Sequence, residues 1–116
     1  MAEGDDSYIA YLTNENQTVQ AKYDGTLYTG QLPVTSTMGV VRGTQFVTSG
    51  VTYSKVSETN MDSSINSTTG AISVSSIATG SPALGLVAGP AIATYRATIG
   101  SLTLDKILTI NVSYDG

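Results

Sequence analysis

The sequence predicts an all-β protein, a β-sandwich of about seven or eight antiparallel strands joined by Greek-key connections. Three observations predict this class. Of the 116 residues, 10 are Val, 8 are Ile and 17 are Thr, and such β-branched side chains favour extended strands. Turn signals recur about every 8–12 residues, which is typical of sandwiches. The last third of the chain alternates apolar and polar residues, a period that a helix does not produce. A small closed barrel is the alternative arrangement of the same strands.

Composition excludes several classes of function. The chain has no His and no Cys, which removes the commonest general base, thiol nucleophiles, disulfides and the usual zinc ligands. Charged residues make up only 12% and the net charge is −4. The five basic residues are scattered along the chain, so we expect no nucleic-acid partner. No apolar run approaches the length of a membrane helix, so we expect no membrane insertion. The acidic residues 1–6 do not resemble a signal peptide.

The first strands follow a short lead-in. Residues 1–6 are predicted to be a flexible lead-in, and residues 7–116 to form a single domain. Residues 7–13 and 17–22 are predicted strands, because each segment places alternate apolar residues on one side. The Tyr-Asp-Gly sequence at 23–25 indicates a turn, since Gly accepts a positive φ without strain.

Three further strands are predicted before the middle of the chain. Pro33 ends an irregular segment and marks a strand edge or a strand start, because it cannot donate a backbone hydrogen bond. Residues 35–41 form the next strand, and the turn that follows contains Gly43. Residues 45–48 form a short strand, and residues 51–57 form a longer strand that carries Tyr53.

The middle of the chain has a weaker alternation. Residues 58–64 are predicted to be a polar loop, and residues 65–70 a short strand that runs into a Gly turn. Residues 71–77 form a strand with Ile72 and Val74 pointing inward. The segment 78–90 contains several Gly and Pro residues and is predicted to be a long connection.

The C-terminal third has the strongest pattern. Residues 91–99 and 102–114 each alternate over their whole length, which predicts two paired strands. Lys106 interrupts the apolar face of the second segment, and Ile107 interrupts the polar face. We therefore expect a bulge, a bend or the end of the sheet near Asp105 and Lys106.

Two stretches resemble bacterial immunoglobulin-like (Ig-like) domains of group 2. Residues 53–57 (YSKVS), followed by residues 64–74 (SINSTTGAISV), resemble the aromatic strand of that family and its I-x-S-x-x-G-x-I-x-V hairpin. Residues 89–95 (GPAIATY) resemble the start of the closing hairpin of that family. The Gly turn at Gly100 and the alternating residues 102–112 resemble the rest of that hairpin.

The N-terminal half is similar to the opening of Ig-like repeats in tail-fibre and host-specificity proteins of long-tailed bacteriophages. The similar segments are residues 10–15 (AYLTNE), 18–19 (TV) and 24–26 (DGT), and in those chains a domain ends where residues 114–116 (YDG) stand here. The resemblance implies a structural and adhesion module of the virion tail, located outside the cell, that spaces or displays a receptor-binding tip. Its implied partners are other domains of the tail-fibre protein. The same fold in a bacterial surface adhesin, on the cell surface, is the alternative setting.

Three residues are candidates for binding a ligand. Tyr23 and Tyr28 flank Asp24 in a predicted turn, and an exposed Tyr next to a carboxylate can stack on a sugar ring and bond its hydroxyls. A carbohydrate-binding module that holds a cell-surface glycan is therefore the second hypothesis. The simpler interpretation is that these side chains cover a sheet edge. Tyr53 and Tyr95 are predicted core residues, and the Tyr95 hydroxyl is expected to bond to the backbone at a sheet corner.

The carboxylates do not form a catalytic pattern. Asp24 lies in a turn, Glu58 and Asp62 lie in a predicted loop, and no pair is predicted to face a third polar group in an apolar pocket. The spacing of Glu58 and Asp62 also differs from that of an EF-hand calcium loop. We therefore expect no enzymatic activity, no catalytic residue, no metal site and no cofactor. A small glycan hydrolase is the third hypothesis.

Overall fold

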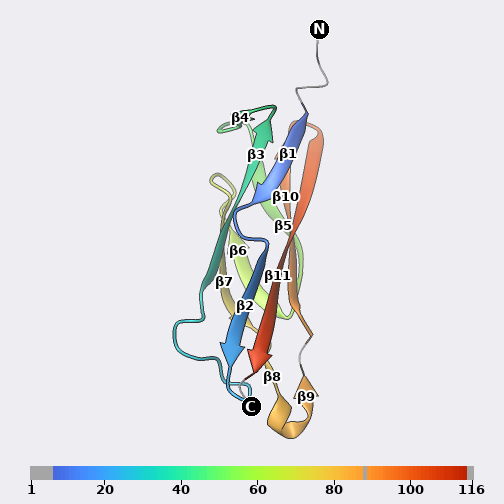
Figure 1. Cartoon of the computed structure of the whole chain (residues 1–116). Helices are drawn as coiled ribbons and strands as arrows, with labels where there is room; N and C mark the ends of the chain where they lie inside the picture. Colours follow the sequence, from blue (N-terminus) through green and yellow to red (C-terminus); the bar gives the residue numbers. More distant parts are fainter. Residues whose placement is uncertain (1–6, 88, 115–116) are drawn as a thin grey trace.

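Two β-sheets face each other in the computed structural model of the chain, which describes residues 7–87 and 89–114 (Figure 1). Within these residues there is no α-helix. The predicted all-β class is confirmed. The two large sheets have separate strand orders, so the strands do not close into the alternative single barrel. The predicted lead-in, residues 1–6, lies outside the described residues.

The first sheet has the strand order β1-β3-β7-β6, and all its neighbouring strands are antiparallel. Its strands are β1 (Tyr8–Leu12), β3 (Val34–Arg42), β6 (Met61–Ile65) and β7 (Ala71–Ile77). The two-residue strand β4 (Gln45–Phe46) pairs with residues 41–42 of β3, whereas β7 pairs with residues 34–37. On the edge opposite β1, β3 therefore has two different partners, β7 and β4, with an interval between them.

The second sheet has the strand order β2-β11-β10-β5. Its strands are β2 (Asn16–Ala21), β5 (Thr52–Thr59), β10 (Ala91–Ile99) and β11 (Leu102–Tyr114). β2 lies parallel to β11, so the prediction that all strands are antiparallel is wrong at this one pair. The physical reason is that β1 and β2 run in the same direction in different sheets (Figure 1). The chain crosses between the sheets without reversing, and β2 then meets the last strand.

The strand count agrees with the prediction. Among residues 7–87 and 89–114, eight strands have five or more residues, and β4, β8 (Gly80–Ser81) and β9 (Leu86–Val87) have two each. β8 and β9 pair as a small hairpin around a 3₁₀ turn at Pro82–Leu84. This hairpin lies within the segment predicted to be a long connection, and it projects at one end of the molecule (Figure 1).

The core lies between the two sheets and follows from the alternation. On β10, the inward-facing residues Ala91, Ala93, Tyr95 and Ala97 are buried, and on β7 the inward-facing residues are Ile72 and Val74. The predictions that Tyr53 and Tyr95 belong to the core are confirmed, since Tyr53 is 6% exposed and Tyr95 is 0% exposed.

The predicted polar loop at residues 58–64 is wrong. β5 and β6 are separated by Asn60 alone, and the chain passes there from the second sheet to the first. Asn60 has a φ of 62°, a left-handed conformation that Asn tolerates better than most residues. Its side-chain amide donates to the carbonyl of Pro90 at 3.2 Å, and its carbonyl accepts from the amide of Ala78 at 2.8 Å. Asn60 thus makes a tight corner without Gly or Pro.

The predicted short strand at residues 65–70 is also shorter than expected. Ile65 is the last residue of β6, and the following residues form a turn. The side-chain Oδ1 of Asn66 accepts from the amides of Thr68 at 2.8 Å and Thr69 at 2.9 Å. This local bonding of an Asn side chain to the backbone competes with a strand ladder.

The irregularity predicted near Asp105 lies elsewhere. β11 pairs with β10 without a shift from Ile110 to Leu102, so β11 has no bulge and the sheet does not end there. The register shift occurs instead between Thr94 and Tyr95, where β10 pairs with β5. The Lys106 side chain is about one-third exposed, and its ammonium group lies 3.7 Å from the carboxylate of Glu15.

Candidate functional site

The residues predicted to bind sugar lie in and just after one tight turn. The amide of Gly25 donates to the carbonyl of Lys22 at 2.8 Å, which closes the turn. The amide of Thr26 donates to Oδ1 of Asp24 at 2.9 Å. This hydrogen bond lowers the pKa of the Asp24 carboxyl below its usual value. The carboxylate of Asp24 therefore already serves to hold the turn.

The two tyrosines of this turn region differ in exposure. Tyr23 is 52% exposed. Tyr28 is half-buried, and the ammonium of Lys22 lies 5.8 Å from the centre of its ring, which covers one face of the ring. The turn also contacts the β8–β9 hairpin, because the amide of Ala83 donates to the carbonyl of Tyr23 at 3.1 Å. Of the two rings, that of Tyr23 is the more open.

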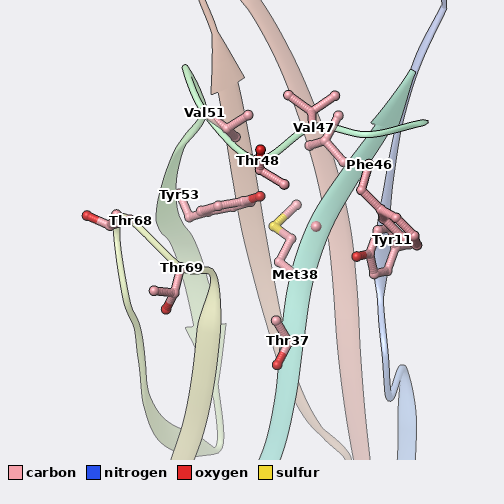
Figure 2. Close-up of a pocket in the computed structure, with 12 residues that line it drawn as sticks. Tyr11, Thr37, Met38, Phe46, Val47, Thr48, Val51, Tyr53, Thr68 and Thr69 are labelled. Carbon is pink, nitrogen blue, oxygen red and sulfur yellow. The ribbon is translucent and has the colours of Figure 1, made fainter. Parts of the chain in front are cut away.

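A cleft lies between β3 and β5, and we call it the β3–β5 cleft (Figure 2). Its volume is about 540 Å³, within the range of about 300–1,000 Å³ that is usual for small-molecule sites. Its lining residues are uncharged: Tyr11, Thr37, Met38, Gly39, Val40, Phe46, Val47, Thr48, Val51, Tyr53, Thr68 and Thr69.

The β3–β5 cleft exists because the partners of β3 change beside it. The amide of Met38 donates to the carbonyl of Gly70 at 2.8 Å, and the amide of Val47 donates to the carbonyl of Val40 at 2.9 Å. Met38 and Val40 are two residues apart, so these bonds leave the same edge of β3. Along this edge of β3, the pairing with β7 ends at Thr37 and the pairing with β4 begins at Val41. No strand of the described residues therefore covers this edge at the cleft.

Tyr53 extends from β5 into the β3–β5 cleft, and its hydroxyl points toward β3 (Figure 2). The side chain is 6% exposed. Within residues 7–87 and 89–114, the Tyr53 hydroxyl has no hydrogen-bond partner. Burial, followed by the nearby Tyr11, raises the pKa of this hydroxyl. Although the side chain is mostly buried, the hydroxyl oxygen itself keeps some contact with solvent, so a water or a ligand can bond to it.

Two aromatic rings stand beside the same opening. Tyr11 is the register partner of Gly39, and any side chain at Gly39 would collide with the Tyr11 ring. The absence of that side chain therefore leaves room for the ring. Tyr11 and Phe46 make an edge-to-face contact with ring centres 6.2 Å apart, and Phe46 is 68% exposed.

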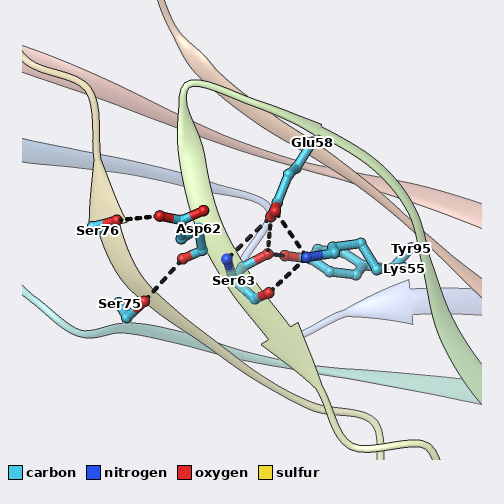
Figure 3. A network of polar contacts seen from close by, with 7 residues as sticks. All are labelled: Lys55, Glu58, Asp62, Ser63, Ser75, Ser76 and Tyr95. Carbon is cyan, nitrogen blue, oxygen red and sulfur yellow. Dashed lines mark hydrogen bonds and ion pairs between the residues drawn. The ribbon is translucent and has the colours of Figure 1, made fainter.

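A polar network connects the sheets at a different place (Figure 3). The Ser63 hydroxyl donates to Oε1 of Glu58 at 2.9 Å and lies 2.7 Å from the hydroxyl oxygen of Tyr95. Because Ser has one hydroxyl hydrogen, Tyr95 is the donor to Ser63. This differs from the predicted bond of Tyr95 to the backbone. The network therefore joins β5, β6 and β10, and it crosses from one sheet to the other.

Both oxygens of the Glu58 carboxylate are engaged in this network. The Lys55 ammonium donates to Oε2 of Glu58 and to the carbonyl of Ser63, each at 2.8 Å, and the amide of Ser63 donates to Oε1 of Glu58 at 3.0 Å. Burial alone would raise the pKa of Glu58, but the hydrogen bonds from Lys55 and Ser63 outweigh it and lower that pKa. Burial raises the pKa of Tyr95, and the charge of Glu58 raises it further.

Two further carboxylates of the described residues bond to neighbouring side chains. Oδ2 of Asp62 accepts from the hydroxyl of Ser76 at 3.0 Å, and Asp105 makes a two-point ion pair with Arg96. In the part of the chain that the structure describes, no three acidic, His or Cys side chains come together. A helix long and apolar enough to cross a membrane is also not found among these residues.

No protein-family model matches the chain, and no curated protein matches its sequence. The class of protein is therefore inferred from the strand order and from the surfaces described above.

Sequence reasoning missed the β3–β5 cleft. Phe46 is the one Phe in the chain, and it follows a Gly turn on a short segment, which is an unusual place for a large apolar side chain. That position could have indicated an exposed aromatic residue. The pairing of Tyr11 with Gly39, and the approach of Tyr53 from another sheet, have no signal in the sequence because they depend on strand register.

Proposed function

We propose that the chain is a non-enzymatic Ig-like module of a phage tail protein, which spaces or displays a receptor-binding tip. The strand orders β1-β3-β7-β6 and β2-β11-β10-β5 support the Ig-like part of this proposal. In Ig-like sandwiches the first, second, fifth and fourth strands form one sheet, and the third, sixth and seventh form the other. With β1 and β2 taken as one strand divided between the sheets, the order here is the same.

One observation carries the spacer role: β2 and β11 are parallel, and the described chain enters and leaves the molecule at opposite ends (Figure 1). Six residue pairs, from Asn16 opposite Thr109 to Ala21 opposite Tyr114, form this contact. A pull on the two ends draws β2 toward the entry end and β11 toward the exit end. The hydrogen bonds between the two strands are then loaded together, in shear.

The length and the contacts of β11 suit the same role. β11 has 13 residues, which corresponds to about 43 Å at about 3.3 Å per residue. It lies between β2 and β10, so a load on the last strand is shared by two neighbours. A rigid strand of this length sets the spacing between whatever precedes and follows the module.

The phage setting rests on the similarity of residues 10–15, 18–19 and 24–26 to the opening of tail-fibre Ig-like repeats. The alternative setting is a repeat of a bacterial surface adhesin. An antibody raised against the chain separates the two. It should label the tails of purified phage particles under the electron microscope. Labelling of bacterial surfaces without labelling of particles would overturn the phage setting in favour of the adhesin.

A carbohydrate-binding module is a second candidate function, which the 52% exposure of Tyr23 favours. A glycan array with the chain and its Tyr23→Ala and Tyr28→Ala variants tests this candidate. Binding that either variant abolishes would support it. If none of the three proteins bound any glycan on the array, this candidate would be overturned and the spacer role would be the one that stands.

The spacer role is tested by pulling on the full chain between two handle domains in a single-molecule experiment. The amide of Gln20 donates to the Gln31 side chain, away from β11, so the amides of odd-numbered residues in β2 face β11. Gln17→Pro should therefore remove a hydrogen bond of the loaded pair and lower the unfolding force. The matched control Thr18→Pro, also at an exposed position, should change the force less.

Chemical denaturation of the same variants shows whether a change in force exceeds the change in equilibrium stability. Equal unfolding forces for Gln17→Pro, Thr18→Pro and the unmodified chain would overturn the proposal that the β2–β11 pair bears the load.

A further inference from the structure

We propose that the β3–β5 cleft binds an uncharged sugar ring, with the Tyr53 hydroxyl as its fixed hydrogen-bonding group and Phe46 and Tyr11 as its apolar wall. This inference is independent of the spacer role, and it places binding away from the turn that contains Tyr23. It rests on three properties of the cleft: its uncharged lining, the unpaired Tyr53 hydroxyl and its aromatic wall.

The lining indicates the charge of the ligand. None of the twelve lining residues is charged, so an ionised group that entered the cleft would lose water without gaining a counter-charge. Threonine residues line the cleft on several sides, from β3 at Thr37, from the segment after β4 at Thr48 and from the β6–β7 turn at Thr68 (Figure 2). Hydroxyl groups both donate and accept. These properties favour a neutral ligand with many hydroxyls.

The Tyr53 hydroxyl supplies the fixed polar contact. Its side chain is 6% exposed and it points into the β3–β5 cleft. Among the described residues it has no partner, whereas the hydroxyl of the fully buried Tyr95 bonds to Ser63 at 2.7 Å. The two buried tyrosines therefore differ in that one hydroxyl is used within the fold and the other is free to bind a ligand oxygen.

The aromatic wall supplies the apolar contact that a sugar ring needs. A pyranose has C–H groups on its faces, and these pack against aromatic rings as other apolar groups do. Phe46 is 68% exposed and is held by its edge-to-face contact with Tyr11 at 6.2 Å. A volume of about 540 Å³ has room for one ring with part of its neighbour.

The test is an NMR titration of the full chain with neutral methyl glycosides of glucose, galactose and mannose and with N-acetylglucosamine. Glucuronate and glucosamine are the charged controls. At least one neutral sugar should shift the amide signals of Gly39, Thr48 and Thr68 in a saturable way, and the charged sugars should do so much less. Tyr53→Phe should weaken binding by about three- to tenfold, the value of one hydrogen bond. Phe46→Ala should also weaken it.

Two variants keep the result decisive. Tyr23→Ala is the matched control at the other site, and it should leave the affinity unchanged. Thr48→Val has nearly the same shape as Thr and removes a rim hydroxyl, so it replaces Tyr53→Phe if that variant fails to fold. The proposal would be overturned if none of the sugars shifted the amide signals, or if glucuronate shifted them equally. It would also be overturned if the shifts were confined to the residues around Tyr23. The pulling experiment is unaffected by any of these results.

Discussion

The two sheets of this protein differ in how continuously their central strands are paired. In the β2-β11-β10-β5 sheet, β11 pairs with β10 over nine consecutive positions without a shift, and β2 covers the other edge of the second half of β11. In the β1-β3-β7-β6 sheet, β3 is covered by β7 at one end and by β4 at the other, with Gly39 between them.

The two large tyrosines of the core, Tyr95 and Tyr53, differ in what their hydroxyl groups contact. On β10, the Tyr95 hydroxyl is enclosed and bonds to Ser63 at 2.7 Å. Beside the interrupted sheet, the Tyr53 ring is nearly as buried, but its hydroxyl faces an opening. An enclosed hydroxyl without a partner costs about 1–3 kcal/mol, and among the described residues the Tyr114 hydroxyl on β11 is such a group. A hydroxyl at an opening can be satisfied by solvent or ligand.

The largest effect is expected from Tyr95→Ala. This change removes a fully buried ring and leaves Ser63 and Glu58 without part of their network. We expect the free energy of unfolding to fall by about 3–5 kcal/mol, as for other large aromatic truncations. Urea denaturation followed by circular dichroism measures the loss. A loss as small as that of the exposed Phe46→Ala control would contradict the enclosed packing described for this ring.

A smaller effect is expected from Glu58→Gln, which weakens the bonds to Lys55 and Ser63. At neutral pH we expect a loss of about 1–2 kcal/mol. The pKa of Glu58 is lowered by folding, so its contribution is present above the pKa of the unfolded chain and is lost as the pH falls through the folded pKa. The stabilities of the two proteins should therefore converge in acid.

The pH series also has an internal control. The carboxyl of Asp105 has a pKa lowered chiefly by its hydrogen bond with Arg96, but that ion pair lies on the exposed face. Asp105→Asn should give a smaller loss that salt removes, since surface ion pairs are weak and screened. A constant gap between Glu58→Gln and the unmodified protein at every pH would contradict the role assigned to the Glu58 carboxylate.

The smallest effects on stability are expected when only the hydroxyl group of Tyr95 or of Tyr53 is removed, and these two variants test the difference between the tyrosines most directly. Tyr95→Phe should cost about 1 kcal/mol because it removes a donor to Ser63. Tyr53→Phe should change the free energy of unfolding by less than about 0.5 kcal/mol, because no described residue accepts from that hydroxyl. Both variants keep the ring, so the difference reports the hydroxyl alone. Equal losses would show that the Tyr53 hydroxyl is used by the fold, which would remove the basis for the sugar site.

Much of the fold could be predicted from particular residues. The inward rows Ala91 to Ala97 and Ile72 to Val74 follow from alternation, and the structure buries them. The corner at Asn60 could not be predicted, because a left-handed Asn without Gly or Pro has no distinctive local signal. The candidate site was predicted at Tyr23, whereas the larger opening lies at Tyr53. That residue was correctly predicted to be buried, but its environment depends on three separate segments.

The sequence by itself determined which segments are extended, which side of each strand is apolar and where several of the turns lie. These properties are local, since they depend on the type and spacing of neighbouring residues. Only the tertiary structure decided that β2 lies parallel to β11, that Ser63 completes the bonding of Tyr95, and that Gly39 stands beside an uncovered edge. Each of these depends on the register between segments far apart in the chain, and register is set by the packing of the whole core.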